Sequence, residues 1–135
     1  GSYADMPINH KVFLAQFDAI KKIADEGPCI LVGRCADYAL EEYDNVLSVF
    51  IHADLDARIR RIARIYDLTD AKAKEMIIKT DKKRASYYNY YSNKKWSSAE
   101  SYDICLDSSI LGIEGTAEAI EKLVEIKERD DNKKL

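Results

Sequence analysis

The amino-acid sequence predicts a single α/β domain, on two observations. Short, continuously apolar runs alternate along the chain with amphipathic segments at helical spacing, an order typical of parallel strands covered by helices. The 135 residues, 47% hydrophobic and 33% charged, are enough for one domain with a buried core. This composition excludes a disordered chain, and no apolar run reaches the roughly 18 residues that a membrane-spanning helix needs.

The first predicted element is a helix over about residues 9–26, because apolar residues recur there on one helical face. The residues of that face are Phe13, Phe17, Ile20 and Ala24. Gly27 suits the left-handed position that ends a helix, and Pro28 prevents the helix from continuing.

Three short apolar runs predict strands, at residues 29–32, 46–51 and 102–106. The first run lies between Pro28 and Gly33 and contains no polar residue in alternation. It therefore predicts a strand that is buried on both faces, as in a parallel sheet covered by helices.

Further helices are predicted between and after these strands. Residues 34–42 form a short helix or turn, and Asp54 can cap a helix over about residues 55–66. Thr69 can cap another helix, which is expected to end at Thr80 at the earliest and at Tyr90 at the latest. The last amphipathic helix is expected over about residues 116–128.

The three cysteines, Cys29, Cys35 and Cys105, form no C-x-x-C pair. Their odd number and their spacing argue against a disulfide framework or a structural zinc site, so we expect a reducing, cytoplasmic location. The two histidines, His10 and His52, do not have metal-ligand spacing with a cysteine, and we expect no metal ligands in this chain.

The formal net charge is −3, but basic residues are concentrated in one segment. From Lys72 to Lys95 the chain carries eight basic and two acidic residues, a net +6, so the remainder carries −9. A cationic segment on an acidic body favours one anionic ligand bound at one place over general binding of nucleic acid.

Ligands bind at the carboxyl ends of parallel strands, so residues that follow the predicted strands are candidates for a site. After the first strand, Gly33 allows a sharp turn, Arg34 follows it, and Asp37 comes three residues later. A guanidinium can grip a phosphate through two hydrogen bonds, and a carboxylate can accept a hydrogen bond from an exocyclic amine. An ordinary Arg–Asp pair at the start of a short helix fits the same spacing.

After the second strand, Arg58 and Arg61 share one side of the next predicted helix. They can face a nucleotide base or phosphate, or belong to a solvated face.

The basic segment contains three adjacent cations, followed by four tyrosines within residues 87–91. The cations are Lys82, Lys83 and Arg84, and they are well suited to clamp a polyphosphate. Four tyrosines so close together cannot all enter one core from a single helix, so some must lie at a surface, a cleft or an interface. Charge and stacking in this segment also fit single-stranded nucleic acid, and a solvated helix remains an alternative.

Four stretches, in their order and spacing, resemble the cytidylate kinase-like family of P-loop nucleoside monophosphate kinases. They are ILVGRCADYAL, VLSVFIHADLDARIRRI, TDKKRASYYNYY and YDICLDSSILGIEGTAEAI. The resemblance covers about residues 13–124. It implies a partial P-loop NTPase-like parallel sheet flanked by helices, in one domain over residues 1–135 with a lid-like helical insertion over residues 67–101.

The resemblance also implies roles for the matching residues. The acceptor monophosphate would be bound by Gly33, Arg34 and Asp37. A mobile lid that neutralises the transferring phosphoryl group would contain Lys82, Lys83 and Arg84. Other nucleotide-binding positions would be Arg58, Arg61, Asp107 and Ser108.

The family's phosphate loop, G-x-x-x-x-G-K-[ST], is not among these 135 residues. In the family it follows a first strand that lies between the strands matching residues 29–32 and 46–51. Without that strand, both would face unpaired backbone groups, which is costly in an interior. We therefore expect the intact polypeptide to carry a strand and a phosphate loop before Gly1, together with most ligands for ATP and Mg²⁺. The alternatives are that another chain or a segment of a partner fills the gap, or that a short protein has rearranged its sheet.

The predicted function is transfer of the terminal phosphoryl group of ATP to a nucleoside monophosphate, with CMP or dCMP favoured. Such a reaction depends on positioning, charge neutralisation and exclusion of water by a closing lid. A non-catalytic nucleotide-binding module, or pseudokinase, is the alternative. The expected partners are the two nucleotides and no membrane; the negative net charge argues against nucleic acid, and a homo-oligomer remains open.

Overall fold

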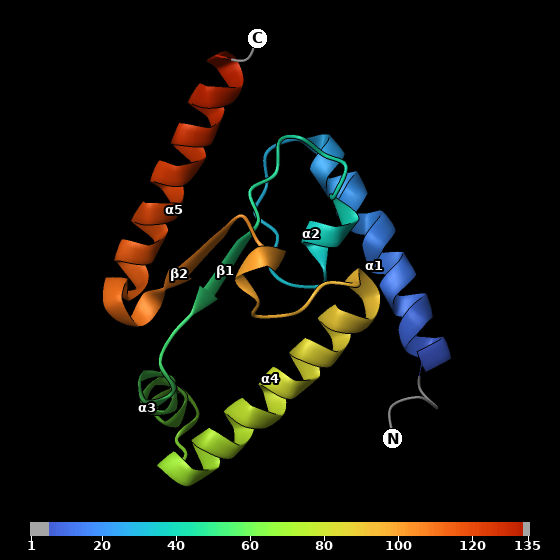
Figure 1. Ribbon diagram of the computed structural model, residues 1–135. Helices are drawn as coiled ribbons and strands as arrows, with labels where there is room; N and C mark the ends of the chain where they lie inside the picture. The colour runs from blue at the N-terminus through green and yellow to red at the C-terminus, as the bar shows by residue number, and fades with distance from the viewer. Residues whose placement is uncertain (1–5, 134–135) are drawn as a thin grey trace. The chain divides into compact units, whose positions relative to one another are not determined.

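A computed structural model describes the backbone of residues 6–133 and the side chains of residues 10–130. It is mainly helical, with one small parallel sheet (Figure 1). The elements in chain order are α1 (Met6–Glu26), α2 (Ala36–Ala39), β1 (Val49–His52), α3 (Leu55–Tyr66), α4 (Asp70–Ser92), a 3₁₀ helix (Ala99–Ser101), β2 (Ile104–Asp107) and α5 (Ser108–Lys133). The chain divides into two compact units: unit 1 comprises residues 1–46 and 87–94, and unit 2 comprises residues 47–86 and 95–135.

Unit 1 contains α1, α2 and the last turns of α4. The predicted apolar face of α1 is confirmed, because Phe13 and Ile20 are buried and Phe17 and Ala24 pack against the core. The buried centre of this core consists of Ile20, Ala36, Ala39 and Leu40. The chain leaves α1 through Gly27 at φ +145°, a backbone conformation that residues with side chains rarely adopt.

Aromatic packing holds the end of α4 against α1 within unit 1. The ring of Phe13 stacks on Tyr91 with 4.0 Å between the centroids. Tyr88 and Tyr91 are buried, whereas the Tyr90 side chain is 52% exposed. The expectation that the four tyrosines cannot all enter one core is therefore confirmed, since those one helical turn apart, at positions 88 and 91, share the buried face.

The strand predicted at residues 29–32 does not form, and the prediction that it is buried on both faces is wrong. Ile30 is 94% exposed and Val32 is 89% exposed, while Leu31 between them packs against the core of unit 1. Exposure thus alternates along this segment, but none of the described residues supplies a strand that pairs with it. A strand requires a hydrogen-bonded neighbour, which apolar sequence alone cannot provide.

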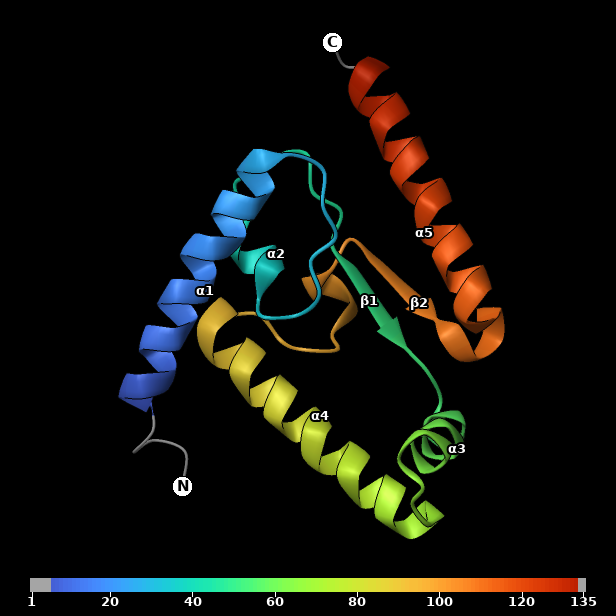
Figure 2. The same ribbon diagram turned by 180° about the vertical axis from the view of Figure 1, so that it is seen from behind.

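Unit 2 contains the sheet, which consists of β1 and β2 in parallel (Figure 2). The register pairs Val49 with Ile104 and His52 with Asp107, and α5 contacts both strands. The ring of Phe50 on β1 meets Trp96 at 5.4 Å edge to face and Tyr102 at 4.8 Å in a stack, so Trp96 packs against the sheet. The α/β class with a parallel pair is confirmed, whereas a P-loop NTPase-like topology stays a prediction.

Two helices, α3 and α4, start where local capping residues predict. The Asp54 carboxylate accepts a hydrogen bond from the Ala57 backbone N–H at 2.8 Å, and the Thr69 hydroxyl accepts one from Lys72 at 3.2 Å. Both predicted caps are confirmed. α4 runs two residues beyond the predicted Tyr90, and α5 begins at position 108 rather than 116, with a break at Gly112.

A search of the helices in the described part of the chain finds none with both the length and the apolar character required to cross a bilayer.

Candidate functional site

A left-handed turn leads from the 29–32 segment into α2. Gly33, Arg34 and Cys35 have φ values of +71°, +57° and +56°, and the Ala36 N–H closes the turn on the Gly33 carbonyl at 3.1 Å. Non-glycine residues in this region cost about 1–3 kcal/mol each, and such strain is found most often at functional sites. The side chain of Cys35 is buried beneath the turn, whereas that of Arg34 is exposed.

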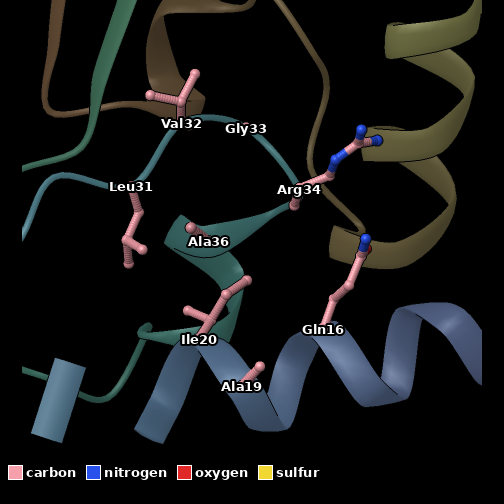
Figure 3. Close-up of a pocket in the computed structure, with 8 residues that line it drawn as sticks. All are labelled: Gln16, Ala19, Ile20, Leu31, Val32, Gly33, Arg34 and Ala36. Atoms are coloured by element: carbon pink, nitrogen blue, oxygen red, sulfur yellow. The ribbon is translucent and has the colours of Figure 1, made fainter. Parts of the chain in front are cut away.

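A pocket of about 180 Å³ lies beside this turn, entirely within unit 1 (Figure 3). Its lining residues are Gln16, Ala19, Ile20, Leu31, Val32, Gly33, Arg34 and Ala36. The polar side chains among them are Gln16 and Arg34, which both extend toward the last turns of α4 in Figure 3. Ligand sites for whole small molecules usually exceed about 300 Å³, so this pocket is small, and most of its lining side chains are apolar.

Asp37 is held by two hydrogen bonds from different elements. Its Oδ1 accepts from the Tyr38 backbone N–H at 2.9 Å, and its Oδ2 accepts from the Tyr88 hydroxyl at 2.7 Å. Within the side chains that the structure describes, no ion pair joins Arg34 to Asp37. The alternative of an ordinary Arg–Asp pair is therefore not realised among these side chains.

Burial and nearby negative charge suppress ionisation around the turn. Burial, together with the Asp37 carboxylate, raises the pKa of the Cys35 thiol to about 11. Burial also raises the pKa of the Tyr87 hydroxyl, and Arg34 opposes this effect. At neutral pH the Cys35 thiol and the Tyr87 hydroxyl are therefore uncharged.

Cys35 is expected to react with iodoacetamide at pH 8 roughly 100-fold more slowly in the folded protein than in urea. The thiolate is the reactive form, and a free thiol has a pKa of about 8.5, well below that of folded Cys35. Mass spectrometry of the labelled peptides measures both rates, with the exposed Cys29 as an internal reference. Folded Cys35 labelling as fast as Cys29 would contradict this placement.

The basic candidates lie in unit 2. The Arg58 guanidinium forms an ion pair with Asp81 at 2.7 Å, and the two side chains are 33% and 25% exposed. Arg61 is exposed on α3, and Lys82, Lys83 and Arg84 are exposed on α4. Arg58 therefore already has a carboxylate partner, whereas the three adjacent cations of α4 face solvent.

A double-mutant cycle with Arg58→Gln and Asp81→Asn is expected to give a coupling free energy of about 0.5–1 kcal/mol. The two side chains are half-buried and lie within hydrogen-bonding distance of each other, so solvent screens their charges only partly. The matched control is Lys122 with Glu125 on α5, at 3.6 Å and more than half exposed, for which urea unfolding should reveal almost no coupling. Equal coupling in the two pairs would contradict the prediction.

Asp107 and Ser108 lie where β2 ends and α5 begins. The Asp107 carboxylate accepts hydrogen bonds from the Ser109 hydroxyl and from its backbone N–H, the latter at 2.9 Å, and these bonds lower the pKa of Asp107. The Ser108 hydroxyl donates to the His52 carbonyl at 3.3 Å. Both residues therefore lie at the carboxyl edge of the parallel sheet, the edge at which α/β proteins bind ligands.

The structure thus brings the predicted acceptor residues together in unit 1 and places the predicted lid and donor residues in unit 2. Sequence reasoning missed Gln16, Tyr87 and Tyr88, which reach the turn from α1 and α4. Across the described residues, no group of three or more His, Cys, Asp or Glu side chains is placed to hold a metal ion.

The chain is similar to known proteins in sequence and in structure. The family model described as "Cytidylate kinase-like family" matches residues 1–110. A cytidylate kinase from Methanococcus vannielii is 31% identical over 104 residues, which are 75% of this chain and 59% of that protein. The chain therefore spans about three fifths of the length of this curated relative. A crystal structure of an uncharacterized protein from Eubacterium ventriosum matches 87% of this chain and 74% of its own with a TM-score of 0.83 and 29% identity.

Proposed function

Because the chain belongs to the cytidylate kinase-like family, we propose that it transfers the terminal phosphoryl group of ATP to a nucleoside monophosphate, with CMP or dCMP the expected acceptor. The observation that carries this proposal is the position of Arg34. A strained, left-handed turn holds its guanidinium, without a carboxylate partner among the described side chains, at the rim of a pocket of about 180 Å³.

In the proposed reaction an oxygen of the acceptor phosphate attacks the γ-phosphorus of ATP. The bond from that phosphorus to the β–γ bridging oxygen breaks, ADP leaves, and a nucleoside diphosphate forms. Arg34 holds the acceptor phosphate through bidentate hydrogen bonds, which fixes the attacking oxygen in line with the donor. Asp37 accepts a hydrogen bond from an exocyclic amine of the acceptor base, which favours cytosine over uracil.

The cations of α4 supply the charge neutralisation that phosphoryl transfer needs. Lys82, Lys83 and Arg84 are exposed and adjacent, so they can close over a polyphosphate without first breaking an ion pair. Arg58, in contrast, would have to exchange Asp81 for a nucleotide phosphate. Arg61 on the same helix is exposed, and Asp107 and Ser108 at the sheet edge would contact the donor nucleotide.

Members of this family use ATP and Mg²⁺ in general. Among the described residues of this chain, no group of three or more His, Cys, Asp or Glu side chains converges to hold a metal ion. We therefore assign no step of the reaction to Mg²⁺ held by these residues.

The test is an assay of the full-length protein with ATP and a panel of monophosphates: CMP, dCMP, UMP, AMP and GMP. ADP release that depends on CMP or dCMP is expected, together with formation of the corresponding diphosphate. If no monophosphate is consumed but calorimetry detects nucleotide binding, the non-catalytic nucleotide-binding module replaces the kinase. If there is neither turnover nor binding, the assignment is wrong.

A further inference from the structure

The end of α4 reaches the acceptor turn through two tyrosine hydroxyls. Tyr88 is 6% exposed, and its hydroxyl donates to Asp37 Oδ2 at 2.7 Å. The preceding residue, Tyr87, donates to the Gln16 side-chain oxygen at 3.1 Å. Neither hydrogen bond is local in sequence, since their partners lie 51 and 71 residues away. Such hydrogen bonds hold a polar side chain in one rotamer, whereas without them it would populate several.

The hydrogen bond from Tyr88 determines what Asp37 can offer to a ligand. One carboxylate oxygen is occupied by the Tyr38 backbone N–H and the other by the Tyr88 hydroxyl. Each oxygen can accept one more hydrogen bond. Because the two donors fix the carboxylate, they also fix the directions from which a ligand can donate to it. The carboxylate is thus held in one direction before any ligand arrives, which lowers the entropic cost of binding.

The hydrogen bond from Tyr87 likewise fixes the side-chain amide of Gln16, which lines the pocket. Because the Gln16 oxygen accepts from Tyr87, the Gln16 side-chain nitrogen is left with both of its N–H donors. Gln16 and Arg34 line the same pocket, and both extend toward the end of α4 (Figure 3). Two neighbouring donor groups, one of them charged, are the chemistry that recognises a phosphate monoester.

We propose that Tyr88 and Tyr87 are positioning residues of the acceptor site: Tyr88 orients Asp37, and Tyr87 orients Gln16, a further acceptor-binding residue beside Arg34. This inference rests on the proposed function, because the ligand that the oriented groups receive is the nucleoside monophosphate. It assigns to the tyrosine-rich run a role in substrate affinity rather than in binding nucleic acid.

The test compares Tyr88→Phe and Tyr87→Phe in the full-length protein with Tyr90→Phe as the matched control. Each change removes one hydroxyl and keeps the ring, so the aromatic packing of unit 1 is retained. Tyr90 lies on the same helix and is 52% exposed. We expect KM for CMP to rise about three- to tenfold in the first two variants, with KM for ATP and kcat nearly unchanged. The Tyr90→Phe enzyme should match the wild type in all three constants.

A double-mutant cycle separates positioning from a merely structural role. In an Asp37→Asn background, Tyr88→Phe should no longer raise KM for CMP, because the group that Tyr88 orients has already been altered. The inference is overturned if Tyr88→Phe leaves KM for CMP unchanged in an active enzyme. It is also overturned if KM for CMP and for ATP rise together as Tm falls. If the wild type neither binds nor converts any monophosphate, the proposed function and this inference fail together.

Discussion

Replacement of Arg34 by alanine is expected to lower kcat/KM for CMP by roughly 100-fold, mainly through a higher KM. Hydrogen bonds to charged groups are worth about 1.5–3 kcal/mol each, and a guanidinium can form two of them with a phosphate. Alanine keeps the Cβ, so the left-handed backbone of the turn remains as strained as before. Because the Arg34 side chain is exposed, the free energy of unfolding should change by less than about 0.5 kcal/mol.

Two further variants make this result specific to the turn. Arg34→Lys keeps the charge but loses the bidentate geometry, so it should recover only part of the lost kcat/KM. Arg64→Ala removes an equally exposed guanidinium from α3 and should leave the kinetics unchanged. A wild-type kcat/KM for CMP in Arg34→Ala, or an equal loss of kcat/KM in Arg64→Ala, would contradict binding of the acceptor phosphate by Arg34.

The second large effect is expected from the triple variant Lys82→Ala, Lys83→Ala and Arg84→Ala. Its kcat should fall roughly 1,000-fold while KM for CMP changes little, since these cations act on the charge of the phosphoryl group in transfer. All three side chains are exposed on α4, and alanine favours helix, so the fold should be retained. Stopped-flow or coupled ADP-release assays measure the change.

The matched control is the triple variant Lys72→Ala, Lys74→Ala and Lys79→Ala. It removes the same charge from the same helix, and these side chains are also exposed. Its kcat should stay within about threefold of the wild type, because only general electrostatic attraction is lost. If both triple variants lose activity equally, the three adjacent cations have no specific role in transfer.

Local signals in the sequence were sufficient to place the end of α1 and the starts of α3 and α4. The N-terminal caps at Asp54 and Thr69 and the positive φ of Gly27 depend on residues within one turn of the chain. The same holds for the turn at Gly33, which follows an apolar run and adopts a left-handed conformation. These features are readable because their physical causes are local.

Long-range features could not be predicted in the same way. The run at residues 29–32 has the composition of a buried strand, but Ile30 and Val32 are exposed because no described strand lies beside them. Sheet formation depends on a partner that a one-dimensional pattern does not reveal.

The partners of the candidate site residues are also distant in the sequence. Asp81 lies 23 residues from Arg58, and Tyr88 lies 51 residues from Asp37. The sequence therefore indicated which side chains carry suitable chemistry, but not which of them are already engaged. The tyrosine-rich run predicted only that the four rings cannot all enter one core, and nothing in the spacing identified Gln16 or Asp37 as hydrogen-bond partners of Tyr87 and Tyr88.

The central claim, that the Arg34 guanidinium binds the phosphate of a mononucleotide, is tested most directly by calorimetry. CMP and cytidine are titrated into the full-length wild type and into Arg34→Ala. The wild type should bind CMP about 100-fold more tightly than cytidine, and Arg34→Ala should reduce that ratio to about threefold or less, because the phosphate loses its main partner. A ratio that is the same in both proteins would contradict the account.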